Sequence, residues 1–284
     1  MKLFAVLLSG IMAAAPAMDT RQEITTVINA VNYTILVNAD GKTAELKSAL
    51  LPASYAETFV PQEIEGYTIT SLSEKAYAGN FSLEKITIHG GIKSMGAKTF
   101  MSCTELKEVV IGQGITAIPD ECFFSCPKLT KVTLPTTLKS IGEEAFFGCE
   151  ELDAVIPSGV IAIGKDAIGK KATAHEEGSV LVEGFLMKGT TGSTAARYAR
   201  ENGIDFVDPK NFVAGDVNGD DTSDASDASS VLAEYAMVST GAPVSYSRKQ
   251  IFMGDMNSDG IIDASDSSVI LEIYAANSTG GGKG

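Results

Sequence analysis

Oxygen-bearing side chains recur twice in the same order near the C-terminus. The first set runs from Asp216 to Asp227 and the second from Asp255 to Asp266, so equivalent residues lie 39 positions apart. The repetition extends further, because Leu232, Tyr235 and Ala236 are matched by Leu271, Tyr274 and Ala275. Calcium is a hard cation that takes roughly six to eight oxygen ligands, which a loop can supply from alternate positions. The spacing therefore predicts two calcium sites.

The expected ligands occupy positions 1, 3, 5, 9 and 12 of each loop, with a main-chain carbonyl at position 7. Position 6 needs a left-handed backbone, which Gly260 adopts freely and which Asp221 tolerates. We therefore expect the first loop (loop 1) to bind calcium more weakly than the second (loop 2). The ligands of loop 1 are Asp216, Asn218, Asp220, Thr222 through its carbonyl, Asp224 and Asp227; those of loop 2 are Asp255, Asn257, Asp259, Ile261 through its carbonyl, Asp263 and Asp266.

Each loop precedes a segment with the pattern of a helix. No amphipathic helix is expected before loop 1, because residues 207–214 are few and include Pro209. We expect both units to consist of a loop and a following helix, without the entering helix of an EF-hand. Position 12 is Asp in both loops, whereas calcium sensors use Glu there. Solvated turns are the alternative interpretation, but two loops in register, each with a matching helix, favour a metal site.

These tandem loops, each leading to a helix with Tyr-Ala, resemble a type I dockerin. That resemblance implies a small all-α module with two loop-helix motifs, whose partner is the cohesin domain of a cellulosomal scaffoldin. It also implies that calcium binding and folding are coupled, and the identical pairs would allow docking in two orientations. The partner-binding residues that it implies are Ala225 and Ser226, Ala264 and Ser265, and the helix positions Leu232, Ala233, Leu271 and Glu272.

A repeat with a period of 23 residues occupies the middle of the chain. Three sets of positions follow it: Leu83, Leu106, Leu129 and Leu152; Tyr77, Phe100, Phe123 and Phe146; and Ile69, Ile92, Ile115 and Leu138. A single unit of this length cannot bury its own apolar face, so units must stack into a solenoid. The pattern resembles the BspA-like leucine-rich repeat family. It implies an α/β solenoid with one short strand and one helix or turn per repeat.

The segments on either side of the repeats fit caps. Residues 33–46 predict a hairpin that turns at Ala39-Asp40-Gly41. Residues 192–203 predict a short helix with Ser193 or Thr194 as its N-cap and Gly203 as its stop, followed by a strand over 204–207. The expected organisation is a signal peptide (1–17), an N-terminal cap (18–66), repeats (67–170), a C-terminal cap (171–208), a dockerin (209–277) and a flexible tail (278–284).

Composition limits the function further. The chain carries 22 Lys and Arg against 36 Asp and Glu, a net charge of −14. No basic patch supports nucleic-acid binding, and no segment after the apolar N-terminus could span a bilayer. Lys2, the apolar run that follows it and Ala15-Pro16-Ala17 predict an export signal.

No catalytic constellation is recognisable. Three of the four cysteines, Cys103, Cys126 and Cys149, share one repeat position, which favours a column of buried thiols over disulfides or a zinc site. Cys122 is expected to share a helical face with Cys126. Neither His89 nor His175 stands in an active-site context. Acidic pairs at 143–144 and 150–151 fit a solvated repeat face better than a glycosidase site.

The sequence therefore predicts a secreted, non-catalytic component of a cellulosome. The dockerin would bind cohesin with two calcium ions, and the solenoid would display a surface for a protein or cell-surface ligand. The chain has no Trp, so aromatic platforms for polysaccharide are not expected. A surface adhesin whose calcium loops only stabilise its end is the first alternative. A polysaccharide- or peptide-degrading enzyme is the second.

Overall fold

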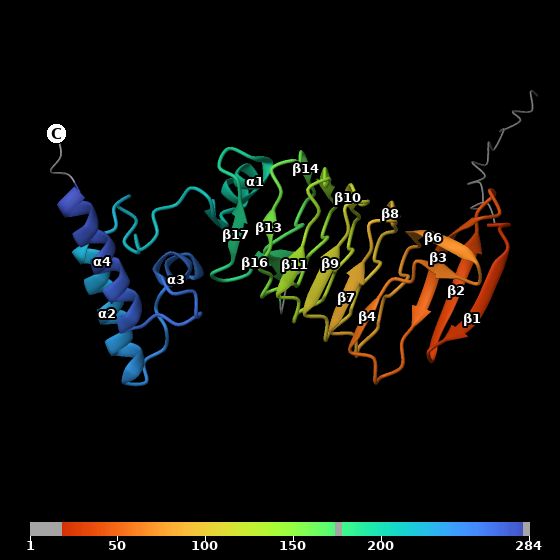
Figure 1. Cartoon of the computed structure of the whole chain (residues 1–284), viewed down its shortest axis with the longest axis horizontal. Coiled ribbons are helices and arrows are strands. Elements are labelled where there is room, and N and C mark those ends of the chain that lie inside the picture. The colour runs from red at the N-terminus through yellow and green to blue at the C-terminus, as the bar shows by residue number, and fades with distance from the viewer. Residues whose placement is uncertain (1–18, 174–177, 281–284) are drawn as a thin grey trace, which may run out of the picture.

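The computed structural model describes residues 19–173 and 178–280, with a mixed sheet at one end, stacked coils in the middle and helices at the other end (Figure 1). The predicted signal peptide (1–17) and His175 lie outside the described residues, as does most of the predicted tail. In the described part, no helix is long and apolar enough to cross a membrane.

The N-terminal cap is a sheet of the order β1-β2-β3-β6-β5. The predicted hairpin is confirmed: β2 and β3 pair antiparallel, and Asp40 accepts hydrogen bonds from the main-chain nitrogens of Lys42 and Thr43 in the turn. β3 then pairs parallel with β6, and β6 pairs parallel with β8, so the sheet of the cap continues into the repeats. The strands are β1 Glu23–Ile28, β2 Val31–Val37, β3 Thr43–Leu50, β5 Glu63–Ile64, β6 Tyr67–Leu72 and β8 Ser94–Met95.

Each repeat forms one coil with two short strands. One parallel sheet has the order β11-β9-β7-β4 and a second has the order β10-β12-β14. The expectation of one strand per repeat is therefore wrong. The strands of the first sheet are β4 Glu57–Phe59, β7 Lys85–Ile88, β9 Glu108–Ile111 and β11 Lys131–Thr133; those of the second are β10 Ala117–Ile118, β12 Ser140–Ile141 and β14 Ala162–Ile163.

The segments between the two strands are turns, so the helix alternative for each repeat is wrong and the turn alternative is right. Lys75, Lys98, Glu121 and Glu144 occupy the same place in successive coils, and all have a left-handed backbone, with φ between 50° and 61°. A residue with positive φ cannot continue a right-handed helix. Each of these segments therefore closes as a turn.

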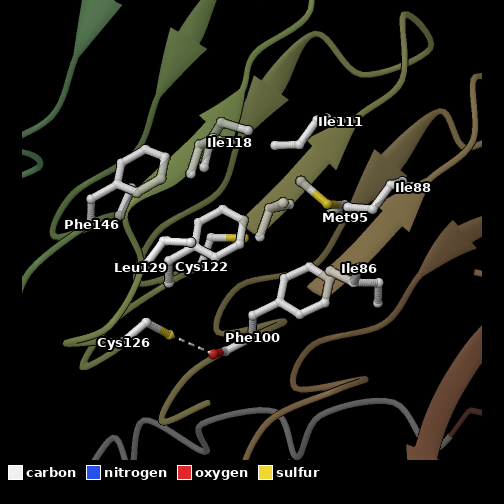
Figure 2. Packing of buried hydrophobic residues seen from close by; sticks show 14 of the residues in the cluster. Ile86, Ile88, Met95, Phe100, Ile111, Ile118, Cys122, Cys126, Leu129 and Phe146 are labelled. Carbon is white, nitrogen blue, oxygen red and sulfur yellow. Dashed lines mark hydrogen bonds between the residues drawn. The ribbon is translucent and has the colours of Figure 1, made fainter. Parts of the chain in front are cut away.

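The interior of the solenoid is built from columns of equivalent side chains. Tyr77, Phe100, Phe123 and Phe146 are fully buried and stack with centroid separations of 5.4, 5.3 and 5.1 Å. Figure 2 shows Phe100 and Phe146 with the neighbouring Leu and Ile side chains of this core. The periodic positions predicted to be apolar thus all face inward.

The cysteines form a second column. All four are free and buried, as predicted for three of them. Each repeat cysteine donates its Sγ–H to a carbonyl of the preceding coil at 3.2 Å: Cys103 to Tyr77, Cys126 to Phe100 (Figure 2), and Cys149 to Phe123. Burial raises the pKa of Cys103 to about 11 and that of Cys149 to about 12. These thiols therefore stay protonated and unreactive near neutral pH.

Cys122 does not share a helical face with Cys126, because residues 119–126 form a turn and not a helix. Glu121 in this turn has a φ of 53°, which breaks the helical path just before Cys122. Both sulfurs are nevertheless buried in the same core.

Opposite charges alternate across the outer face of the first sheet. Glu57, Lys85, Glu108 and Lys131 are register partners on β4, β7, β9 and β11. Lys85 and Lys131 lie 3.1 and 3.6 Å from Glu108. Asp153 follows in the next coil and lies 2.9 Å from Lys188. We call these six residues the charge row. Beside it, Phe59 and Val155 are exposed at the two ends of the face.

The C-terminal cap matches its prediction. α1 (Thr194–Asn202) begins at Ser193, whose side chain accepts from the Ala196 nitrogen, and ends at Gly203 with a φ of 69°. The strand expected over 204–207 is present as β18. It closes the sheet β13-β17-β18, while β15 and β16 form a separate pair. The strands are β13 Val155–Ile156, β15 Lys170–Ala172, β16 Ser179–Leu181, β17 Leu186–Gly189 and β18 Asp205–Val207.

Three helices follow the cap: α2 (Ala225–Ser239), α3 (Arg248–Gly254) and α4 (Ala264–Gly280). We call residues 209–280 the C-terminal module. The prediction that neither loop has an entering helix holds for loop 1 but is wrong for loop 2, since α3 leads directly into it. Ser247 and Gln250 cap α3 reciprocally, and such a capping box initiates a helix even in a short segment.

Candidate metal centre and binding faces

The first expected ligand of each loop organises the turn that follows it. Asp216 accepts from the main-chain nitrogens of Gly219 at 2.6 Å, Asp220 at 3.1 Å and Asp221 at 3.0 Å. In loop 2, Asp255 accepts from Asp259 at 3.1 Å and Gly260 at 2.9 Å. These bonds wrap the main chain around the carboxylate at position 1.

The sharp turn at position 6 has the expected geometry in both loops. Asp221 has a φ of 66° and Gly260 a φ of 81°. Both residues are in the left-handed region, where Gly carries no steric penalty and Asp carries a reduced one. The weaker calcium binding expected for loop 1 rests on this difference between Asp221 and Gly260. The calcium affinities of the two loops stay a prediction.

The carboxylate at position 12 lies inside the protein in both loops. Asp227 accepts from the nitrogens of Val217 at 3.0 Å, Asn218 at 3.1 Å and Asp224 at 3.0 Å. Asp266 accepts in the same way from Met256, Asn257 and Asp263. Both side chains are 0% exposed. Each carboxylate therefore joins the beginning of its loop to the first turn of the helix that follows.

The remaining expected ligands are held by short-range hydrogen bonds. Asp224 is the N-cap of α2. Bonds from Thr222 lower the pKa of Asp220, and bonds from Ser265 lower that of Asp263. These groups are therefore ionised at neutral pH, as ligands of a hard cation must be.

The fit to calcium can be judged from the donors. In loop 1, carboxylate oxygens of Asp216, Asp220 and Asp227 lie within 4.8 Å of one another. Among the described residues this grouping is found for loop 1, and the equivalent aspartates of loop 2 are not gathered as closely. The donors of both loops are carboxylates, an amide and a carbonyl, all of which calcium accepts. The residues present therefore fit the ion.

Equivalent residues of the two loop-helix units meet in the core of the module. Val231 of α2 and its equivalent Ile270 of α4 are both fully buried in one cluster. The hydroxyl of Ser267 donates to the carbonyl of Ala228 at 3.0 Å, and these two positions are also equivalent. The outer surfaces of the two units therefore present matching positions, although Ala233 of the first unit corresponds to Glu272 of the second.

All eight predicted partner-binding residues lie on these outer surfaces. Ala225, Ser226, Leu232 and Ala233 are exposed on α2 (the α2 face), and Ala264, Ser265, Leu271 and Glu272 are exposed on α4 (the α4 face). In both units the Asn at loop position 3 donates to the serine hydroxyl: Asn218 to Ser226 at 2.8 Å and Asn257 to Ser265 at 3.1 Å. The loops therefore orient the residues that the docking prediction requires.

Sequence reasoning missed three features of the module. Tyr235 and Tyr274 are 42% and 43% exposed and extend the two faces; their positions 39 residues apart were a usable signal. Glu234 is buried, and it accepts hydrogen bonds from Ser245 and Tyr246. The third is α3, for which the Ser247 to Gln250 capping spacing was a signal.

Comparison with known proteins identifies the repeats. Residues 63–173 match the family described as "BspA type Leucine rich repeat region" in 6 copies. Similar solved structures are leucine-rich repeat proteins from T. pallidum, with 22% identity and a TM-score of 0.47, and from Bacteroides ovatus, with 28% identity and a TM-score of 0.43. The chain matches over 55% and 48% of its own length, and over 68% and 36% of theirs. No curated protein matches. The repeat region is thus a BspA-type leucine-rich repeat domain, and no catalytic family is found.

Proposed function

Taking residues 63–173 as a BspA-type leucine-rich repeat domain, we propose that the chain is a secreted, non-catalytic binding protein. Its C-terminal module binds two calcium ions and docks onto the cohesin domain of a scaffoldin, in the manner of a type I dockerin. The solenoid then displays a surface for a protein or cell-surface ligand, outside the cell and attached to a cellulosome or cell surface.

One observation carries the calcium part of this proposal. Asp227 and Asp266 are completely buried carboxylates, and Asp216 is only 2% exposed. The ion pairs of the described residues all lie between residues 19 and 188, so they leave the loop aspartates without a protein cation. Main-chain N–H groups donate to Asp227 and Asp266, but these donors carry no net charge, and burying a carboxylate without a counter-charge is unfavourable. A bound cation at each loop supplies the missing charge.

The outer surfaces support docking. The α2 and α4 faces each combine an Ala-Ser pair with an exposed leucine and tyrosine; Leu232 and Leu271 are both 43% exposed. Tyrosine beside an apolar residue is typical of the centre of a protein interface. Because the two faces share the Ala-Ser pair, the leucine and the tyrosine, either one can occupy the same cohesin surface after a half-turn of the module.

A cohesin panel tests this proposal. Full-length protein is captured on immobilised cohesins, with calcium and with chelator, and at least one cohesin should retain it only with calcium. Changing Ser226 to Glu or Ser265 to Glu alone should leave docking through the other face, whereas the double variant should lose it. The Asp255→Ala, Asp266→Ala variant should lose docking and keep the thermal transition of the solenoid. Absence of any calcium-dependent cohesin would refute the docking proposal.

The surface adhesin remains the second candidate, because the outer face of the first solenoid sheet carries exposed Phe59 and the next coil carries exposed Val155 on β13. For an adhesin, the solenoid would be the principal binding site. Binding of the protein to bacterial or host cells should then persist in chelator. Replacing Phe59 and Val155 with Ser should weaken it.

A further inference from the structure

Helix α3 lies between the rest of the C-terminal module and the last strands of the solenoid (Figure 1). Phe252 on this helix packs against Phe212, with ring centroids 5.0 Å apart and planes inclined by 47°. Lys188 of β17 places its Nζ 4.5 Å from the centroid of the Phe252 ring. Cations over aromatic faces attract each other, so one ring contacts both the segment leading to loop 1 and the solenoid.

The lysine is itself held in place. Its Nζ lies 2.9 Å from Asp153, and its side chain is only 15% exposed. Lys188, Asp153 and Phe252 line a cavity of about 250 Å³ together with Asp255. The first ligand of loop 2 therefore lies at the boundary between the solenoid and the module.

The position of α3 determines the position of that ligand. Asp255 is the C-cap of α3, and its main-chain nitrogen donates to the Ile251 carbonyl at 2.9 Å. One turn of helix separates Phe252 from Asp255, so a shift of the ring carries the carboxylate with it. The Met253 carbonyl also accepts from the nitrogen of Gly215 at 2.7 Å, next to the first ligand of loop 1.

We propose that Phe252 is a positioning residue for calcium: seated between Phe212 and Lys188, it holds α3 against the solenoid and places Asp255 for the ion. The inference rests on the proposed calcium binding and deepens it. Coupling between two binding events is reciprocal, so calcium in loop 2 also favours the seating of α3. Calcium then sets the direction in which the α2 and α4 faces project from the solenoid.

Calorimetric titration of the full-length protein with calcium alone tests the first half of this coupling. Phe252→Ala should weaken calcium binding about threefold to tenfold, the loss expected for one aromatic contact. Lys188→Ala should weaken it about twofold to fivefold through the lost cation–π contact. Lys188 belongs to the solenoid, so an effect of its removal on calcium affinity must pass through the interface. Val244→Ala, an exposed aliphatic change in the module, should leave the affinity unchanged.

Trypsin cleavage after Lys210, an exposed residue at the start of the C-terminal module, tests whether calcium in turn favours the seating of α3. Calcium should slow this cleavage in the wild type and slow it less in Phe252→Ala. If Phe252→Ala does not fold, Phe252→Leu and Lys188→Ala serve instead. Tight calcium binding that neither change alters would overturn the coupling and leave the calcium proposal standing. A wild type that binds no calcium would overturn both.

Discussion

Truncation of Phe123 tests whether the aromatic column holds the solenoid together. Its ring is 0% exposed and is stacked on both faces, 5.3 Å from Phe100 and 5.1 Å from Phe146. A buried Phe→Ala change costs about 3 to 5 kcal/mol of the free energy of unfolding. Both ring faces lose a partner in Phe123→Ala, so we expect a cost of about 4 to 5 kcal/mol, at the upper end of that range.

The neighbouring Phe124 provides a matched control. It is only partly buried and has one stacked partner, Phe147, at 5.1 Å. The Phe124→Ala change should therefore cost about 1 to 2 kcal/mol. Because the two positions are adjacent in the chain, differences in local backbone propensity are small, and the comparison isolates burial and stacking.

Urea unfolding followed by circular dichroism measures both costs. The chain has no Trp, so the sheet signal is monitored in place of tryptophan fluorescence. Coils interact only with their neighbours, and Phe123→Ala removes contacts in the middle, so its transition should also broaden. If Phe123→Ala does not lower the free energy of unfolding more than Phe124→Ala does, the aromatic column is not the main source of the solenoid's stability.

Three further predictions concern smaller features. Because burial raises the pKa of Cys103 to about 11 and that of Cys149 to about 12, the four thiols should resist iodoacetamide at pH 8 until urea unfolds the chain. The unfolded thiols ionise near pH 8.5. The stability that the folded, protonated thiols contribute is therefore complete below about pH 8.5 and is lost as the pH rises toward 11. The urea midpoint should be lower at pH 10 than at pH 8, and a higher midpoint at pH 10 would contradict this. Asp221→Gly relieves a left-handed aspartate and should tighten calcium binding by loop 1 by up to about fivefold; unchanged titration isotherms would contradict this. Burial raises the pKa of Glu234, but bonds from Ser245 and Tyr246 outweigh it and lower the pKa overall. The module should therefore lose stability as the pH falls below about 4, and Glu234→Gln, expected to cost about 1 to 2 kcal/mol, should lose less over the same range in thermal melts.

The solenoid interior was predictable because every coil repeats one environment. Once Phe100, Phe123 and Phe146 are seen to recur with one period, stacking requires them to face the same core. The turns were not predictable in the same way. Lys98 and Glu121 adopt positive φ although neither residue type favours it, since the closure of the coil outweighs local preference.

In the candidate site, too, some features could be predicted from the sequence and others could not. The expected ligand positions are a prediction from loop chemistry, and the repetition predicts matching places for Ser226 and Ser265, both of which are exposed. The contact of Phe252 with Lys188 joins residues 64 positions apart with no periodic partner, so no pattern in the chain could indicate it. Such contacts depend on how the solenoid and the C-terminal module meet, which only the tertiary structure determines.

The charge row makes the solenoid sensitive to whether coils are lost in even or in odd numbers. Lys85, Glu108, Lys131 and Asp153 alternate in sign from coil to coil, so loss of one coil would bring Lys85 beside Lys131, whereas loss of two would bring it beside Asp153. Like charges directly opposite on neighbouring strands are unfavourable. Shortening the solenoid by an even number of coils should therefore be tolerated better than shortening it by an odd number, which restricts how this domain can change length.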